Sequence, residues 1–229
     1  MVLGGQSAIG PMHISVGLPN QDSLCFGAYR SGFSFVAVAD GVGSCRYSQE
    51  GSQKAVQVIR DLCKRGPKWL EDANKGAYLQ KYIVSKWERS IGGNLLDYAT
   101  TINFVIVGKK CVWLGQIGDG LILAQMGEHF LVLEETNAVP PYTFALGGIG
   151  AAENFRLYAL KPCKQMSVFL SSDGIGRVLN PFIFSEFLSY MRKMILKNPA
   201  QAQKELKEWF VSLDKLNQDD KTFGVLLCR

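Results

Sequence analysis

The sequence has no long apolar run. No stretch of the 229 residues approaches the roughly 18 to 20 uncharged residues that a membrane-spanning helix needs. Residues 1–12 lack the basic region followed by an apolar region that marks a signal peptide. We therefore expect a cytoplasmic protein without a membrane partner.

The sequence is also poor in side chains that bind zinc or copper. It has two histidines, His13 and His129, and its six cysteines are scattered without a C-x-x-C pair. Scattered cysteines beside apolar segments indicate free thiols in a reducing compartment. Neither histidine lies near a serine in a nucleophile-elbow sequence, which argues against a Ser-His-Asp hydrolase and favours exposed or hydrogen-bonded histidines.

Clusters of like charge are missing too. The net charge is +5, but the longest basic runs are pairs such as Lys109-Lys110, which lies between two apolar segments and predicts a hairpin turn. Gly41-Val42-Gly43 follows a strand-like run, but Arg46 stands where a dinucleotide-binding loop has its third glycine. We therefore expect no nucleic acid and no dinucleotide as a partner.

Short apolar segments rich in β-branched and aromatic residues are abundant. They are separated by Gly turns, which predicts antiparallel strands at 13–16, 24–29, 33–39, 101–107, 111–117, 121–125, 129–133, 155–159, 166–170 and 222–228. Amphipathic helical patterns fall in two pairs, at 48–64 with 69–90 and at 181–197 with 200–214.

In this sequence the strands come in runs and the helices come in pairs. A parallel sheet instead requires strands and helices that alternate strictly along the chain. The pattern predicts an α+β fold in which helices cover the outer faces of layered antiparallel sheets. With 229 residues, of which 47% are hydrophobic, the chain suits one domain that spans residues 1–229. The loop 134–153 is the one long irregular stretch in this prediction, and we expect it to border the functional site.

Five acidic segments lie next to apolar runs, and in four of them an Asp stands beside a Gly or another Asp. They are Asn20-Gln21-Asp22, Asp40-Gly41, Asp119-Gly120, Asp173-Gly174 and Asp219-Asp220. Carboxylates on turns at the ends of buried strands are a usual form of a loop-borne site on a rigid scaffold. If the turns converge, they build an all-oxygen site, which suits Mg²⁺ or Mn²⁺ rather than zinc or copper.

The order and spacing of these segments resemble those of the metal-dependent, type-2C Ser/Thr protein phosphatases. The resemblance covers nearly the whole chain and rests on the segments Asn20-Gln21-Asp22, Val38-Ala39-Asp40-Gly41-Val42-Gly43, Ala99-Thr100-Thr101, Ile117-Gly118-Asp119-Gly120, Ala145-Leu146-Gly147, Ser171-Ser172-Asp173-Gly174 and Asp219-Asp220-Lys221-Thr222. It implies a four-layer α-β-β-α sandwich, in which two antiparallel sheets are flanked by helix pairs.

The resemblance also implies roles for single residues. Asp40 resembles the carboxylate that bridges two Mg²⁺ or Mn²⁺ ions, and Gly41 resembles the residue whose carbonyl binds the second ion. Asp173 and Asp219 resemble the other direct ligands of the first ion. We expect Gly at position 41 because the chain must turn sharply there, through backbone angles that favour glycine.

The remaining acidic residues have less direct roles by the same resemblance. Asp22 resembles the residue that orients metal-bound water, and Asp119 resembles a ligand of a weakly held third ion, although an ordinary turn explains Asp119 equally well. Asp220 stands where the family commonly has Asn, and it is expected to support a ligand or bind water.

Two positions depart from the better-known family pattern. Gly17 stands where many members have an Arg that grips the substrate phosphate, so we expect Arg46, or alternatively Arg177, to replace it. Val42 stands where many eukaryotic members have a His that protonates the leaving group. An apolar residue there is typical of bacterial members.

The sequence thus predicts a compact, bacterial-type, Mn²⁺- or Mg²⁺-dependent phosphatase for phosphoserine and phosphothreonine in proteins, which uses water held between two ions as the nucleophile. A cognate Ser/Thr kinase is the expected opposing partner. Two alternatives stay open: a catalytically silent relative that binds phosphopeptides or acts as a scaffold, and a phosphatase for a small metabolite.

Overall fold

Ten β-strands and six α-helices make up the computed structural model, which describes residues 1–135 and 143–228. The strands are β1 (Val2–Ala8), β2 (Asp22–Ala28), β3 (Ser34–Asp40), β4 (Ile102–Val107), β5 (Val112–Ile117), β6 (Leu121–Met126), β7 (His129–Leu133), β8 (Arg156–Leu160), β9 (Met166–Ser171) and β10 (Lys221–Leu227). The helices are α1 (Pro11–Val16), α2 (Ser48–Arg65), α3 (Gly76–Glu88), α4 (Asp173–Gly176), α5 (Phe184–Lys197) and α6 (Pro199–Ser212).

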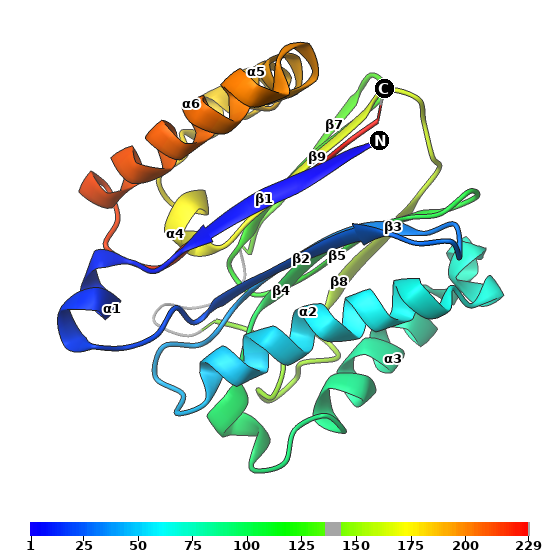
Figure 1. The fold of residues 1–229 in the computed structure, drawn as a ribbon. Helices are drawn as coiled ribbons and strands as arrows, with labels where there is room; N and C mark the ends of the chain where they lie inside the picture. Colours follow the sequence, from blue (N-terminus) through cyan, green and yellow to red (C-terminus); the bar gives the residue numbers. More distant parts are fainter. Residues whose placement is uncertain (136–142, 229) are drawn as a thin grey trace.

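The strands form two five-stranded antiparallel sheets, with orders β1-β10-β9-β6-β7 and β2-β3-β4-β5-β8. The sheets are stacked face to face, with α5 and α6 outside the first sheet and α2 and α3 outside the second (Figure 1). The predicted α+β fold, a four-layer α-β-β-α sandwich, is therefore confirmed.

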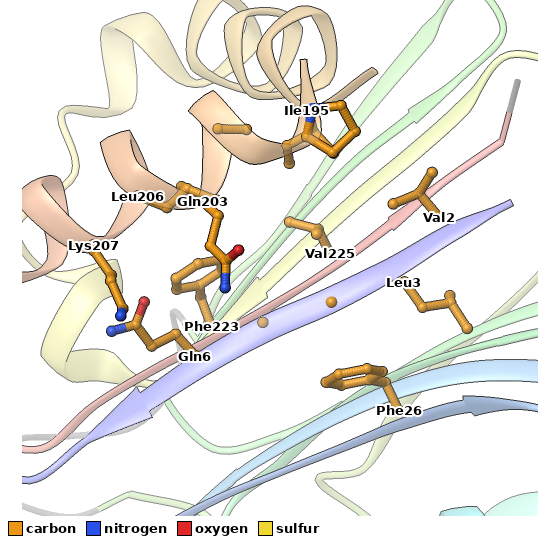
Figure 2. Close-up of a pocket in the computed structure, with 14 residues that line it drawn as sticks. Val2, Leu3, Gln6, Phe26, Ile195, Gln203, Leu206, Lys207, Phe223 and Val225 are labelled. Carbon is orange, nitrogen blue, oxygen red and sulfur yellow. The ribbon is translucent and has the colours of Figure 1, made fainter. Parts of the chain in front are cut away.

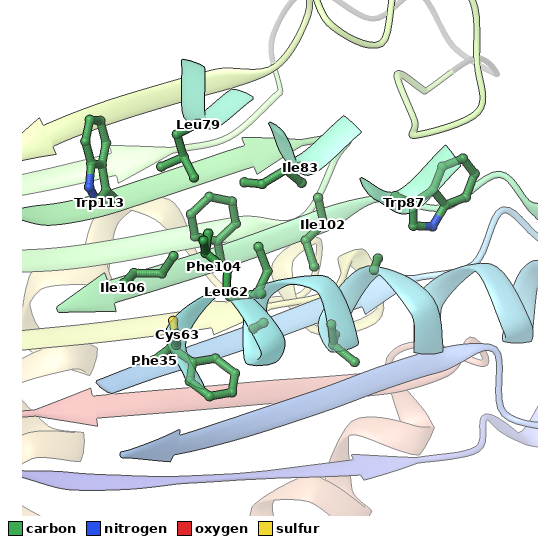
Figure 3. Close-up of a cluster of buried hydrophobic side chains, with 14 of the residues drawn as sticks. Phe35, Leu62, Cys63, Leu79, Ile83, Trp87, Ile102, Phe104, Ile106 and Trp113 are labelled. Atoms are coloured by element: carbon green, nitrogen blue, oxygen red, sulfur yellow. The ribbon is translucent and has the colours of Figure 1, made fainter. Parts of the chain in front are cut away.

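Successive side chains of the central strands point to opposite faces of the sheet and so belong to different layers of the core. In β3, Val36 and Val38 pack into the cluster between the sheets, whereas Phe35 and Ala37 pack against the helices. Both faces are buried, so the strand shows a continuous apolar run in the sequence. Figure 3 shows the helix-side cluster, where Phe35 and residues of β4 and β5 meet residues of α2 and α3.

The predicted strand at 13–16 is wrong, because this segment is the short helix α1. Pro11 occupies its first turn, where a missing amide hydrogen costs nothing. Gly17 ends the helix with a left-handed φ of 72°. An Arg at position 17 would be strained in that conformation, so the absence of the family's Arg has a structural reason.

Strand β1 was missed by the sequence analysis because Gly4 and Gly5 lower its strand propensity. Gly5 lies opposite Gly224 of β10 in the register of the sheet. A Cβ on Gly224 would lie 2.3 Å from a methyl carbon of Val36 in the other sheet. The two sheets therefore approach closely here, and the glycines permit that approach.

The predicted helix at 69–90 is partly wrong. Its first part consists of two 3₁₀ turns, Lys68–Glu71 and Ala73–Lys75, and α3 begins only at Gly76. The Asp72 side chain accepts a hydrogen bond from the Asn74 amide at 3.0 Å, which favours a turn over a continuous helix.

Two other expectations hold. Lys109 and Lys110 lie in the turn that joins β4 to β5. All six cysteines are free thiols. Within the part of the chain that the structure describes, no helix is both long enough and apolar enough to cross a membrane.

Candidate active site

The predicted carboxylates gather at one edge of the two sheets. Asp22 begins β2 and Asp40 ends β3, and these two residues lie opposite each other in the antiparallel register. Asp119 lies between β5 and β6, Asp173 follows β9, and Asp219 precedes β10. Antiparallel pairing within each sheet brings these strand ends to the same edge.

A cleft of 280 Å³ lies at this edge. Asp40, Asp119, Asp173 and Asp219 line it, whereas Asp22 is buried next to Asp40 with 7% of its surface exposed. Thr143 also lines the cleft, so the end of the irregular loop borders the site as predicted. The rest of that prediction, including Pro140-Pro141, falls on residues 136–142, outside the described part of the chain.

Two threonines hold the backbone of Asp40. The Asp40 amide donates to Thr101 Oγ1 at 3.0 Å, and the Asp40 carbonyl accepts from Thr100 Oγ1 at 2.8 Å and from the Thr101 amide at 2.8 Å. Thr100 in turn forms isolated β-bridges with Gly41 and Leu146. Three motif segments that are distant in the sequence thus fix the position of one carboxylate.

Glycine is required at position 41 for a different reason from the one predicted. Gly41 does not have a positive φ, so a left-handed turn does not explain it. A Cβ at this position would lie 2.6 Å from the carbonyl oxygen of Ser48, the first residue of α2. The close approach of α2 to the end of β3 therefore selects glycine.

Gly41→Ala is expected to destabilise the fold by about 1 to 3 kcal/mol, because α2 must move away from Asp40 to make room for the methyl group. Gly43→Ala is the matched control, since its Cβ would come no closer than 3.7 Å to any neighbour, Gln21 Oε1 being the nearest. Urea unfolding of both variants measures the difference. Equal stabilities would contradict the close-packing explanation.

Ser172 joins Asp22 to the strands of the other sheet. Its hydroxyl donates to Asp22 Oδ2 at 2.7 Å and accepts from the Thr222 amide at 3.1 Å. The second Asp22 oxygen, Oδ1, is buried and has no hydrogen-bond partner in the described structure, and the same holds for Oδ1 of Asp173.

Arg177 is the guanidinium that lies beside the carboxylates. Its Nη2 atom is 2.7 Å from Asp119 Oδ2 and 2.8 Å from Asp173 Oδ2. The four-residue spacing from Asp173 to Arg177 is a signal that the sequence offered. Arg46 lies outside the cleft lining, with its guanidinium 5.1 Å from the centroid of the Tyr47 ring. A role for Arg46 in substrate binding stays a prediction.

Asp220 is a structural anchor whose partners the sequence analysis did not foresee. Its Oδ1 accepts from the Gly10 amide at 2.7 Å, and its Oδ2 accepts from the Gln21 amide at 2.6 Å and lies 2.9 Å from His13 Nδ1. Lys221, which is 1% exposed, donates to the Asp219 carbonyl at 2.8 Å. These contacts fasten α1 and the start of β2 to the loop that carries Asp219.

Burial and mutual repulsion raise the pKa values of the clustered carboxyls. Burial is the main cause at Asp22, where it raises the pKa from 3.8 to about 7. Burial, followed by the charges of Asp22 and Asp173, raises the pKa of Asp40 well above its ordinary value. Burial, followed by the charge of Asp119, raises the pKa of Asp173, although Arg177 offsets part of the effect.

The metal-free protein is therefore expected to lose stability as the pH rises from about 4 to about 7. A carboxyl whose pKa is higher in the folded state binds its proton more tightly there, so the folded state is favoured at low pH and loses that advantage on ionisation. Melting temperatures measured in EDTA between these pH values test whether stability falls as the pH rises. Asp22→Asn should make the melting temperature depend less on pH. An unchanged slope of melting temperature against pH in this variant would contradict the role of Asp22.

The donor atoms of the cleft are chemically suited to a hard divalent cation. Asp40 and Asp173 both line the cleft, the charge of Asp173 helps to raise the pKa of Asp40, and the buried Asp173 Oδ1 lacks a hydrogen-bond partner in the described structure. Oxygen donors of this kind are the ligands that Mg²⁺ and Mn²⁺ prefer. No group of three or more His, Cys, Asp or Glu residues that could hold a metal ion is assembled within residues 1–135 and 143–228. The fit therefore rests on the paired carboxylates and their unsatisfied oxygen atoms.

Figure 2 shows a second cavity, of 510 Å³, which none of these carboxylates lines. It is lined by apolar residues of β1, β10 and α6, with Phe26 of β2 at one side. Among the described residues that line it, Lys207 is the one with an ionisable side chain. The described part of its lining contains no Asp or Glu, so it does not provide the acidic cluster predicted from the sequence.

Together, the fold and the cleft define a class of protein: an α-β-β-α sandwich with an acidic cleft at one edge of its sheets. Residues 9–211 match the sequence model of the family described as Protein phosphatase 2C. This match spans most of the chain, so the chain belongs to the protein phosphatase 2C family, as the resemblance predicted. No curated protein sequence matches the chain.

Solved structures of other proteins, among them serine/threonine phosphatases, share the fold. The S. agalactiae serine/threonine phosphatase has a TM-score of 0.69 and 16% identity, with 100% of this chain and 99% of that chain covered. The catalytic domain of the serine threonine protein phosphatase PstP, in complex with two manganese ions, has a TM-score of 0.66 and 16% identity, with 98% and 96% covered. RsbX in complex with magnesium has a TM-score of 0.62 and 14% identity, with 97% and 92% covered.

Proposed function

We propose that the protein hydrolyses phosphoserine and phosphothreonine in proteins, with Mn²⁺ or Mg²⁺ as its cofactor. The observation that carries the proposal is the convergence of four carboxylates, Asp40, Asp119, Asp173 and Asp219, in one cleft at the edge of the sheets. Membership in the protein phosphatase 2C family supports the reaction class. The manganese and magnesium in the related PstP and RsbX structures support the choice of cofactor.

Each residue has a defined task in this proposal. Asp40, the Gly41 carbonyl, Asp173 and Asp219 would hold two ions, and Asp119 would take part in binding a third, weaker one. Bound there, such ions lower the pKa of a water molecule and offset the negative charge of the phosphoryl oxygens. Asp22, held by the Ser172 hydroxyl, supports Asp40 across the strand pair.

The guanidinium of Arg177 supplies positive charge at the same cleft. Its side chain is 64% exposed, so it is free to turn from the carboxylates toward a phosphate. A guanidinium fork matches two phosphate oxygens at once. Arg46, exposed on the loop after Gly43, remains the candidate for a second contact with the substrate.

A competition experiment tests the substrate class. We expect release of phosphate from a phosphothreonine peptide in Mn²⁺ to be faster than release from sugar phosphates or nucleotides at equal concentration. Faster turnover of the small molecules would replace the protein-phosphatase proposal with a metabolite phosphatase. Binding of the peptide without turnover of any phosphoester would indicate a silent binding module. The proposal also implies a cytoplasmic Ser/Thr kinase as the opposing enzyme.

A further inference from the structure

The cleft contains one basic side chain among its described lining residues, and it belongs to His13. The remaining ionisable side chains of the lining are the four carboxylates. His13 comes from α1, a helix that lies before the first strand of the second sheet, and only 5% of its surface is exposed.

Asp220 fixes the orientation of the His13 ring. Its Oδ2 lies 2.9 Å from His13 Nδ1, and both side chains are buried. The Met12 amide also donates to the Gln218 carbonyl at 3.0 Å, so the backbone on either side of the contact is tied together. With Nδ1 engaged, the atom Nε2 has no hydrogen-bond partner within the described chain.

This geometry matters because the proposed substrates have a poor leaving group. The P–O bond of a phosphoserine or phosphothreonine breaks to give an alkoxide, which needs a proton as it leaves. The cleft carboxylates are committed to the cation in the proposed function. Val42, which lines the cleft beside Gly41, has no proton to give.

We infer that His13, oriented by Asp220, is the general acid that protonates the leaving oxygen of the substrate. This inference rests on the proposed function. As water oxygen bonds to phosphorus and releases one of its protons to solvent, the ester P–O bond breaks with its electron pair on the Ser or Thr oxygen. The proton on His13 Nε2 moves to that oxygen and forms the alcohol, and the neutral imidazole then recovers a proton from solvent. Imidazole is suited to this exchange near neutral pH.

His13→Asn is the variant that tests the role with the least disturbance of the fold. The Asn amide nitrogen takes the place of Nδ1 and keeps a donor for Asp220, whereas the atom equivalent to Nε2 is lost. His129→Asn is the matched control, because His129 is exposed at the start of β7 and does not line the cleft. Melting temperatures of both variants establish that they are folded.

The measurement compares two substrates that differ in their leaving groups. On a phosphothreonine peptide in Mn²⁺, His13→Asn should lower kcat about 100-fold or more. On an aryl phosphate with an acidic phenol, whose oxygen needs little help from an acid, the loss should be much smaller. His129→Asn should match the wild type on both substrates.

The pH profile gives an independent readout. Wild-type kcat/KM on the peptide should fall at high pH as the acid loses its proton, and His13→Asn should lack this fall. Asp220 contacts the ring, and Asp40, Asp119, Asp173 and Asp219 line the same cleft, so the comparison uses the difference between the two profiles.

Equal losses on both substrates, or no loss on the peptide, would overturn the acid role and leave His13 as a structural link between α1 and β10. A wild-type protein that is inactive on both substrates in Mn²⁺ would overturn the proposed function itself, and the inference with it.

Discussion

Asp40→Asn should lower phosphopeptide turnover by about 1000-fold or more while the protein stays folded. Asp40 ends β3, faces Asp22 and lines the same cleft as Asp173, so it lies within the acidic cluster. Removal of its charge weakens the hold on the cation, and a loss of several kcal/mol in transition-state stabilisation corresponds to this factor.

The same substitution should leave the metal-free protein at least as stable as the wild type. Burial and the neighbouring charges of Asp22 and Asp173 disfavour an ionised Asp40, and a neutral amide relieves that repulsion. The measurements are kcat in Mn²⁺ and the melting temperature in EDTA. Asp61→Asn, a change at a half-exposed position on α2, serves as the control. A variant that retains wild-type kcat would contradict the placement of Asp40 in the site.

Asp220→Ala should destabilise the protein by about 4 kcal/mol or more. Asp220 is 3% exposed. Its carboxylate accepts hydrogen bonds from the Gly10 and Gln21 amides and contacts the His13 ring. Its removal leaves buried donors without a partner, and each such donor costs about 1 to 3 kcal/mol. Because these contacts join segments about 200 residues apart in sequence, the loss should also free α1 from the loop before β10.

Denaturant unfolding measures this effect, with two variants for comparison. Asp220→Asn keeps one acceptor oxygen and should lose markedly less stability than Asp220→Ala. Asp61→Ala removes a half-exposed carboxylate that pairs with its neighbour Arg60, and it should change stability by less than about 1 kcal/mol. A loss from Asp220→Ala as small as that from Asp61→Ala would show that Asp220 is not an anchor.

Local patterns predicted most of the fold. Runs such as β3 and β9 are buried on both faces, so their apolar character is continuous and is visible in the sequence. Strand β1 was invisible because its Gly4-Gly5 pair suits a close approach to another sheet, and no local propensity reveals such an approach. The 13–16 segment was misassigned because its apolar residues suit a strand, whereas Pro11 and Gly17 set the limits of a helix.

Local patterns also predicted one part of the candidate site, while another part depends on contacts that only the folded structure shows. The acidic segments were recognisable because each Asp stands next to a strand end, and strand ends converge in antiparallel sheets. The contact between His13 and Asp220 spans 207 positions in the sequence and depends on how α1 is placed, so only the folded structure reveals it. The preference for Arg46 over Arg177 as the guanidinium beside the site was based on loop position alone, whereas the helical spacing from Asp173 favours Arg177.

The metal requirement of peptide hydrolysis tests the central claim most directly. Protein stripped with EDTA would be assayed on a phosphothreonine peptide before and after addition of Mn²⁺, with Asp173→Asn in Mn²⁺ beside it. The proposed function predicts no turnover without metal, recovery with Mn²⁺, and a loss of about 1000-fold in the variant. Turnover that persists in EDTA, or that survives the loss of the Asp173 carboxylate, would contradict a metal-dependent phosphatase in this cleft.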